Sequence, residues 1–128
     1  MTAEGPKSVL IVDDDDDTGD LLGVFFERAG WGISLATDVE HARMALAAGK
    51  FSALVTDVNL PDGSGLSLLD GGRSPILRAA VVMTGSSDPH ERHASEQAGF
   101  DGYYTKPVDG AELVSIITRL MSGDLGPR

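Results

Sequence analysis

Short apolar segments alternate with helix-like segments along almost the whole of this chain. The segments suited to strands are Val9–Val12, Ile33–Ala36, Phe51–Thr56, Ala79–Met83 and Tyr103–Thr105. Between them, apolar residues recur at the spacing of one helix face. Strands joined by helices run parallel and need a helix layer on each side. The alternation therefore predicts a three-layer, doubly wound α/β fold with five parallel strands and five helices.

Several of the predicted helices have recognisable starts and ends. Asp88 and Asp109 stand where a side chain can cap a helix, and each is followed three positions later by a glutamate. Gly30 can end the first helix. The third helix is expected to be short, because Leu66–Leu69 is followed at once by Gly71 and Gly72.

The composition fits one acidic domain with an aliphatic core. The chain has 128 residues, of which 41% are hydrophobic and 5% aromatic, and its net charge is -10. Its few basic residues are scattered, so direct binding to nucleic acid or to an anionic membrane is not expected. It has no cysteine and no apolar stretch long enough to cross a bilayer, which favours a cytoplasmic protein. We expect one domain over residues 8–121, with flexible termini at 1–7 and 122–128.

Acidic residues follow two of the predicted strands directly. Val12 runs into Asp13 and Asp14, and Thr56 runs into Asp57. Neighbouring strands lie about 4.8 Å apart, so adjacent strands would bring these carboxylates to one place. Carboxylates that close repel one another unless a positive charge lies among them. The pattern predicts a site for a divalent metal and a phosphoryl group.

Two other strands end in groups that suit phosphoryl transfer. Lys106 and the Thr84 hydroxyl can hold phosphoryl oxygens, and a carboxylate nucleophile would give an aspartyl-phosphate. Mg²⁺ prefers oxygen ligands, which Asp14, Asp57 and the main-chain carbonyl of Asn59 can supply. Ligands in open α/β sheets bind at this carboxyl edge of the strands.

These residues, in this order and spacing, resemble the receiver domain of two-component response regulators. The matching motifs are Asp13-Asp14, Asp57 followed by Pro61 and Gly65, Thr84-Gly85 and Lys106-Pro107. The resemblance extends from about Ser8 to Leu120. It implies a flavodoxin-like sheet with the strand order 2-1-3-4-5.

The resemblance also implies a role for each acid at the site. Asp57 would be the phosphoacceptor, Asp14 a direct Mg²⁺ ligand, and Asp13 a ligand that acts mainly through metal-bound water. Asn59 would contribute its main-chain carbonyl, and Mn²⁺ could replace Mg²⁺. Of the remaining acids in the run, Asp15 is expected to orient the metal site, and Asp16 and Asp17 to cap the first helix.

Further residues would contact the phosphoryl group or respond to it. By the resemblance, Lys106 contacts the phosphoryl group and precedes a cis peptide bond to Pro107. Thr84 follows the phosphoryl group, and Tyr103 matches the switch aromatic of the family. Tyr103 has a second interpretation, as a half-buried tyrosine of a short strand. Strand alternation directs Tyr104 to the opposite face of the sheet.

The function implied is that of a signalling module, which assists only its own phosphorylation and dephosphorylation. The phosphoryl donor would be a sensor histidine kinase or a histidine phosphotransfer protein. An unidentified downstream protein would bind the face formed by the fourth helix, fifth strand and fifth helix. The domain would act as a stand-alone regulator or come from a hybrid kinase or multidomain regulator.

A phosphohydrolase of the haloacid-dehalogenase type is the alternative from another class. Asp14 and Asp16, followed by Thr18, fit the Asp-x-Asp-x-Thr pattern of that family. However, the chain has no acidic pair after Lys106 and no segment that could form a cap. The receiver is therefore the favoured interpretation.

Overall fold

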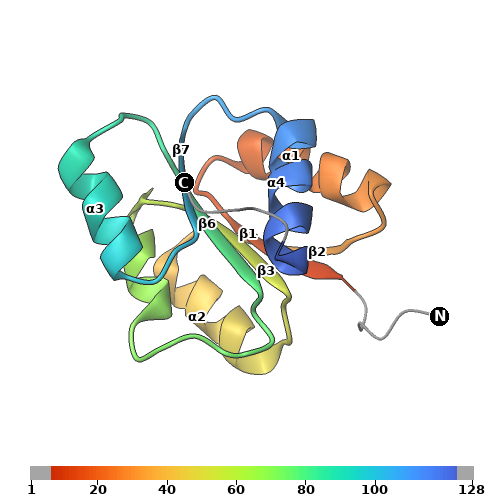
Figure 1. The fold of residues 1–128 in the computed structure, drawn as a ribbon, viewed down its shortest axis with the longest axis horizontal. Coiled ribbons are helices and arrows are strands. Elements are labelled where there is room, and N and C mark those ends of the chain that lie inside the picture. Colours follow the sequence, from red (N-terminus) through yellow and green to blue (C-terminus); the bar gives the residue numbers. More distant parts are fainter. Residues whose placement is uncertain (1–6, 124–128) are drawn as a thin grey trace.

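The computed structural model describes residues 7–123, and its main element is a sheet of five parallel strands. The strands are β1 (Ser8–Val12), β2 (Gly32–Ala36), β3 (Ala53–Asp57), β6 (Ala79–Thr84) and β7 (Gly102–Thr105). Their order is β2-β1-β3-β6-β7 (Figure 1). The two-residue strands β4 (Asn59–Leu60) and β5 (Gly63–Ser64) form a separate antiparallel hairpin. The predicted order 2-1-3-4-5 is therefore confirmed.

Helices cover both faces of the sheet, which gives the predicted three layers (Figure 1). One face carries α1 (Asp16–Arg28) and α4 (Gly110–Ser122), and the other carries α2 (Val39–Ala48), the 3-10 helix η1 (Gly65–Leu69) and α3 (Pro89–Gln97). Of the five predicted helices, four are α-helices in residues 7–123, and the third is the 3-10 helix η1. Gly71 and Gly72 follow η1 with positive φ angles, which no α-helix accommodates.

Alternate residues of each central strand belong to two separate cores. Val12 packs with the α2 and η1 side, whereas Ile11 packs with the α1 and α4 side. β3 and β6 are buried along their whole length, as expected for parallel strands between two helix layers. The same alternation sends Tyr103 to the first core and Tyr104 to the second, as predicted.

Aspartate side chains cap the four α-helices at their N-termini. The caps at Asp88 and Asp109 match the prediction, and Asp38 caps α2. In the first helix, however, Asp15 is the cap, and its side chain accepts a hydrogen bond from the N–H of Asp17. Asp16 and Asp17 lie in the first turn, where their charges favour the helix dipole but do not cap it.

The predicted limits of the domain are only partly covered by the described residues. α4 continues through Ser122, one residue past the expected end at 121. The expected flexibility of the termini concerns residues 1–6 and 124–128, which lie outside the part that the structure describes. None of the helices between residues 7 and 123 has the length and apolar character needed to cross a membrane.

Gly65 lies where the β4–β5 hairpin returns against the strand that carries Asp57. Its N–H donates to the carbonyl oxygen of Val58 at 2.8 Å. A Cβ atom at this position would overlap the carbonyl oxygen of Asp57 and would lie 2.6 Å from Oγ1 of Thr56. The backbone therefore needs a glycine here to pass so close to Asp57.

We predict that Gly65→Ala lowers the free energy of unfolding by about 1–3 kcal/mol, because the added methyl group must displace the Asp57 backbone. Urea unfolding would measure the change. Gly85→Ala is the matched control, since a Cβ there meets no atom within 4 Å. Equal unfolding midpoints for the two variants would contradict this account of Gly65.

Candidate metal and phosphoryl-binding site

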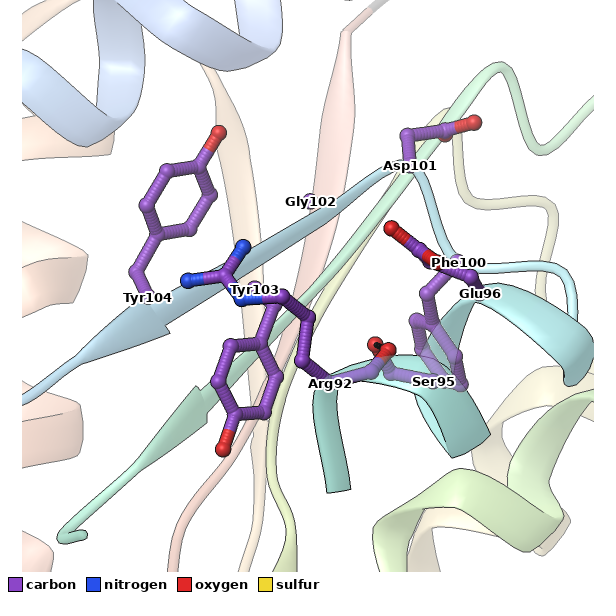
Figure 2. Close-up of a pocket in the computed structure, with 8 residues that line it drawn as sticks. All are labelled: Arg92, Ser95, Glu96, Phe100, Asp101, Gly102, Tyr103 and Tyr104. Atoms are coloured by element: carbon purple, nitrogen blue, oxygen red, sulfur yellow. Dashed lines mark hydrogen bonds between the residues drawn. The ribbon is translucent and has the colours of Figure 1, made fainter. Parts of the chain in front are cut away.

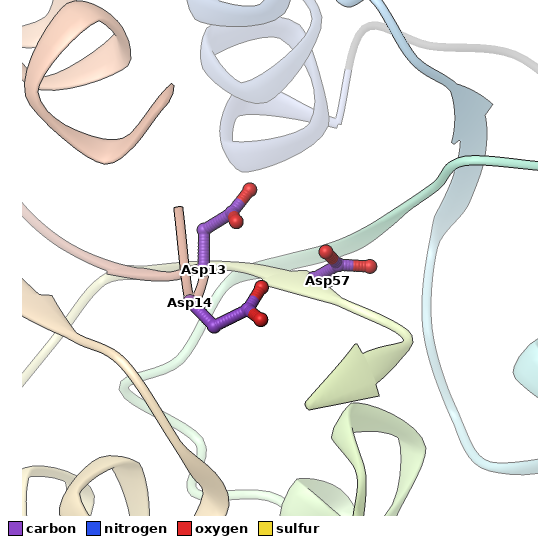
Figure 3. A group of neighbouring side chains, drawn as sticks. All are labelled: Asp13, Asp14 and Asp57. Atoms are coloured by element: carbon purple, nitrogen blue, oxygen red, sulfur yellow. The ribbon is translucent and has the colours of Figure 1, made fainter. Parts of the chain in front are cut away.

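Three carboxylates meet beyond the ends of β1 and β3. These strands are paired, with Val12 opposite Thr56, so Asp13 and Asp57 emerge side by side. Oxygen atoms of Asp13, Asp14 and Asp57 all lie within 4.8 Å of one another (Figure 3). Parallel pairing thus brings together acids that are far apart in the sequence, as the strand ends predicted.

Lys106 brings a positive charge to this cluster. It follows β7, where its backbone N–H donates to the carbonyl oxygen of Thr84 at 2.7 Å. Its Nζ donates to Oδ2 of Asp13 and to Oδ2 of Asp57, both at 2.8 Å. Because Asp13 and Asp57 are only 3% and 7% exposed, their charges need this compensation. The peptide bond to Pro107 is cis, as the resemblance implied.

The two carboxylates keep the Lys106 side chain protonated. Partial burial alone would lower the pKa of Lys106, but hydrogen bonds and charge from Asp13 and Asp57 outweigh it and raise the pKa above its ordinary value of 10.5. A raised lysine pKa means that the stabilisation is complete at lower pH and is lost only as the pH rises through the folded-state value. Lys106 therefore carries its positive charge at neutral pH.

Backbone N–H groups orient two of the carboxylates. Asp13 Oδ1 accepts from the N–H of Asp15 at 2.9 Å, and Asp57 Oδ1 accepts from the N–H of Asn59 at 3.2 Å. Asp15 thus contributes to the cluster through its main chain, while its side chain caps α1. Among residues 7–123, the exposed Asp14 side chain has no hydrogen-bond or ion-pair partner. It is free to bind a ligand from outside.

The donor set suits a hard divalent cation. The three ionised carboxylates and the one ammonium of Lys106 leave two negative charges in the cluster. Carboxylate oxygens at this spacing are the ligands that Mg²⁺ prefers, and Mg²⁺ commonly binds one or two carboxylates together with substrate phosphate. A divalent cation would balance the charge that Lys106 leaves uncompensated.

Thr84 ends β6, and its hydroxyl and that of Tyr103 both meet the loop that leads from β6 to α3. Thr84 is 1% exposed, and its hydroxyl donates to the carbonyl oxygen of Ser86 at 3.1 Å. Tyr103 is 5% exposed, so the expectation of a half-buried side chain is wrong. Tyr103 packs in the core under α3, because the alternation of β7 directs it there.

Asp62 also supports the site, although the sequence analysis did not single it out. Its carboxylate accepts from the N–H of Val39 at 2.7 Å and from the N–H of Glu40 at 3.0 Å. These bonds lower the pKa of Asp62. They tie the hairpin that follows Asp57 to the start of α2. No local pattern reveals this contact, since the partners are 23 and 22 residues apart.

An apolar cavity of about 320 Å³ opens next to the Lys106 side chain. It lies between α1 and the loop after β7 and is lined by Thr18, Leu21, Leu22, Met83, Lys106, Pro107 and Val108. Leu21 is 60% exposed at its rim. An apolar surface therefore adjoins the charged cluster.

Comparison with known proteins gives one family for this fold and site. The model of the response regulator receiver domain matches residues 9–118. The transcriptional regulatory protein GltR of Pseudomonas aeruginosa is 35% identical over 124 residues, which cover 94% of this chain and 51% of GltR. A 14.6 kDa protein of Leptolyngbya boryana is 34% identical, over 91% of this chain and 92% of that protein. The chain thus spans about half the length of some curated relatives and most of another.

Solved structures agree with this assignment. A CheY-like response regulator receiver domain protein of Methanospirillum hungatei superposes with a TM-score of 0.84 at 27% identity, covering 94% of this chain and 97% of that one. The family match, the strand order and the carboxylate edge all lead to one conclusion. The chain belongs to the response regulator receiver domain family of two-component signalling.

Proposed function

We propose that this domain accepts a phosphoryl group on Asp57 and changes its affinity for a partner protein as a result. The observation that carries the proposal is the ion pair of Lys106 with both Asp13 and Asp57, at 2.8 Å each, on the edge where Asp14 is open. The ammonium thus contacts a carboxylate oxygen of the proposed phosphoacceptor. A salt bridge that only stabilised the fold would not require Asp14, the third acid, which has no partner among residues 7–123.

The transfer step follows from the position of Asp57. One carboxylate oxygen attacks phosphorus and forms the new O–P bond, while the P–N bond to the donor histidine breaks. The electron pair of that bond returns to the imidazole nitrogen, which takes up a proton. Lys106 follows the negative charge from the carboxylate to a phosphoryl oxygen, and the Thr84 hydroxyl turns from Ser86 to another phosphoryl oxygen.

Residues that would hold Mg²⁺ are Asp14 and Asp57, with the main-chain carbonyl of Asn59 and with Asp13 acting through water. When bound, Mg²⁺ or Mn²⁺ supplies neutralisation of the charge on the phosphoryl oxygens. The excess of two negative charges around Lys106 supports this assignment. The domain is a signalling module, and its own contribution is to assist its phosphorylation and dephosphorylation.

The phosphohydrolase alternative is not favoured. It requires Asp14 and Asp16 to act together, but Asp16 is the first residue of α1 and lies outside the cluster of Asp13, Asp14 and Asp57. The chain is also placed in the receiver family over residues 9–118.

We propose one surface for the phosphoryl donor and a second surface for a downstream protein. The phosphoryl donor, a histidine kinase or histidine phosphotransfer protein, would cover the apolar cavity between α1 and Val108, because that cavity touches Lys106. A downstream protein would bind the face of α3, β7 and α4, which corresponds to the predicted helix 4, strand 5 and helix 5. The domain limits 8–121, the cytoplasmic location and the stand-alone form stay predictions.

We predict that Asp57→Asn abolishes phosphorylation by acetyl phosphate, because an amide oxygen cannot form a stable acyl phosphate. Intact-protein mass spectrometry in the presence of Mg²⁺ would detect the added phosphoryl group. Asp70→Asn, an exposed aspartate away from the cluster, is the matched control and should be phosphorylated normally. Phosphorylation of Asp57→Asn at the rate of the parent would refute the proposed acceptor.

We predict that Asp14→Asn makes the metal-free protein more stable, by about 1 kcal/mol, because it removes a repelling carboxylate at the rim of the cluster. The same variant should lose the rise in melting temperature that Mg²⁺ gives to the parent protein. Thermal unfolding with chelator and with Mg²⁺ measures both effects. Asp20→Asn, on the exposed side of α1, should change neither by a comparable amount.

We predict that Leu21→Glu slows phosphotransfer from a protein donor at least tenfold and leaves the reaction with acetyl phosphate unchanged. A buried apolar contact of this size is worth more than 1.4 kcal/mol, or a factor of ten. Met44→Glu on α2 is a closely matched control, since Met44 and Leu21 are 61% and 60% exposed. Equal slowing by both variants would contradict docking at the α1 surface.

A further inference from the structure

The β4–β5 hairpin is attached to the rest of the protein at its base and at its turn. At the base, the N–H of Gly65 donates to the carbonyl oxygen of Val58 at 2.8 Å. At the turn, Oδ1 of Asp62 accepts from the N–H of Val39 at 2.7 Å, and Oδ2 accepts from the N–H of Glu40 at 3.0 Å. Each carboxylate oxygen of Asp62 therefore binds one amide at the start of α2.

Asn59 lies in the same hairpin, between these two attachments. It is the first residue of β4 and pairs with Ser64, while Leu60 pairs with Gly63 across the turn. The Asn59 side chain is exposed, so core packing does not hold this residue itself in place. Leu60 packs into the core beside α2, and Asp62 adds a directional attachment of the turn. The position of the Asn59 main-chain carbonyl therefore depends on how the hairpin is held.

Two carboxylates from different parts of the chain bind the first N–H groups of α2. These groups have no partner inside the helix, so they need acceptors from outside it. Asp38 is the N-cap and accepts from the N–H of His41 at 2.8 Å. The N–H groups of Val39 and Glu40 are bound by Asp62 instead. Only the second of these contacts connects the helix to the hairpin.

We infer that Asp62 is a positioning residue for the metal site: it holds the β4–β5 hairpin on α2 and so keeps the Asn59 main-chain carbonyl in place as a ligand. The inference rests on the proposed function and deepens it, because it names what fixes the proposed ligand that comes from the main chain. Coupling between two sites is reciprocal. Mg²⁺ at the carboxylate cluster would therefore strengthen the contact of Asp62 with α2.

The chemistry of the contact suits this role. Hydrogen bonds from the N–H groups of Val39 and Glu40 lower the pKa of Asp62, so its carboxylate is ionised at neutral pH. A hydrogen bond to an ionised acceptor is about twice as strong as one between neutral groups, and a negative charge is favourable at a helix N-terminus. Residues that hold metal ligands in place commonly contribute about 10- to 100-fold to metal affinity.

The test measures the binding of Mg²⁺ alone to the full chain by isothermal titration calorimetry. Asp62→Ala removes both acceptor oxygens and should weaken Mg²⁺ binding about tenfold. Asp62→Asn keeps one acceptor oxygen and should weaken binding by a smaller factor. The asparagine variant decides the question if the alanine variant does not fold.

Two control variants separate positioning from loss of a cap or of a charge. Asp38→Ala also removes a charged cap from the start of α2, so it should lower the melting temperature but leave the Mg²⁺ affinity close to that of the parent. Glu96→Ala removes one negative charge at the pocket between α3 and β7, which Figure 2 shows and which no residue of α2 or of the hairpin lines. It should also leave the affinity close to that of the parent.

Amide hydrogen exchange gives a second measurement, which follows the reciprocal effect. In the parent, Mg²⁺ should slow the exchange of the N–H groups of Val39 and Glu40, because a hairpin held by the metal keeps Asp62 on them. The slowing should persist in Asp38→Ala and be absent in Asp62→Ala.

Two outcomes would count against the inference in different ways. If the parent binds Mg²⁺, and the Asp62 variants bind it with the same affinity as Asp38→Ala, the role of Asp62 is overturned and the proposed function stands. If the parent itself fails to bind Mg²⁺, the metal site of the proposed function is overturned, and the inference with it.

Discussion

The contact on which the rest of this structure depends is that of one ammonium with two buried carboxylates. Lys106 binds Asp13 and Asp57 at once, and the two acids are 3% and 7% exposed. Burying a carboxylate without such a partner costs free energy. Asp13 and Asp57 can be buried because Lys106 pairs with both, and because the N–H groups of Asp15 and Asn59 donate hydrogen bonds to their remaining oxygens. The contact joins the ends of β1, β3 and β7. β6 lies between β3 and β7 in the sheet, and long stretches of chain separate the three strands in the sequence.

The parallel topology makes that contact possible. Every strand of the main sheet delivers its carboxyl end to the same edge, so polar residues placed directly after the apolar segments are gathered without any local sequence motif. The two cores below give the edge its rigidity, because β3 and β6 are buried along their whole length. Gly65 then allows the hairpin to close against Asp57 at a distance that no side chain would permit.

The sequence predicted the features that depend on short-range patterns of residues. It did not predict those that depend on contacts between residues far apart in the chain. The strands, their order and the caps at Asp88 and Asp109 follow from apolar runs and short-range signals. The third helix is short, as Gly71 and Gly72 led us to expect, but its leucines did not reveal that it would be a 3-10 helix. The hydrogen bonds of Asp62 with the start of α2 and of Tyr103 with Glu91 join residues 12 to 23 positions apart, for which a single sequence carries no signal.

In the proposed function, the same imbalance of charge would let the site act as a switch. Three carboxylates around one ammonium repel one another, and a divalent cation or a phosphoryl group would change that balance of charge. If Lys106 transfers its hydrogen bond from Asp57 to a phosphoryl oxygen, Asp13, which binds the same ammonium, has to adjust, and the Thr84 hydroxyl would turn from Ser86. Thr84 shares Ser86 with Tyr103, and Tyr103 is bound to α3. By these contacts, the proposed phosphorylation would carry a local change of charge from the carboxyl edge of the sheet to the surface of α3.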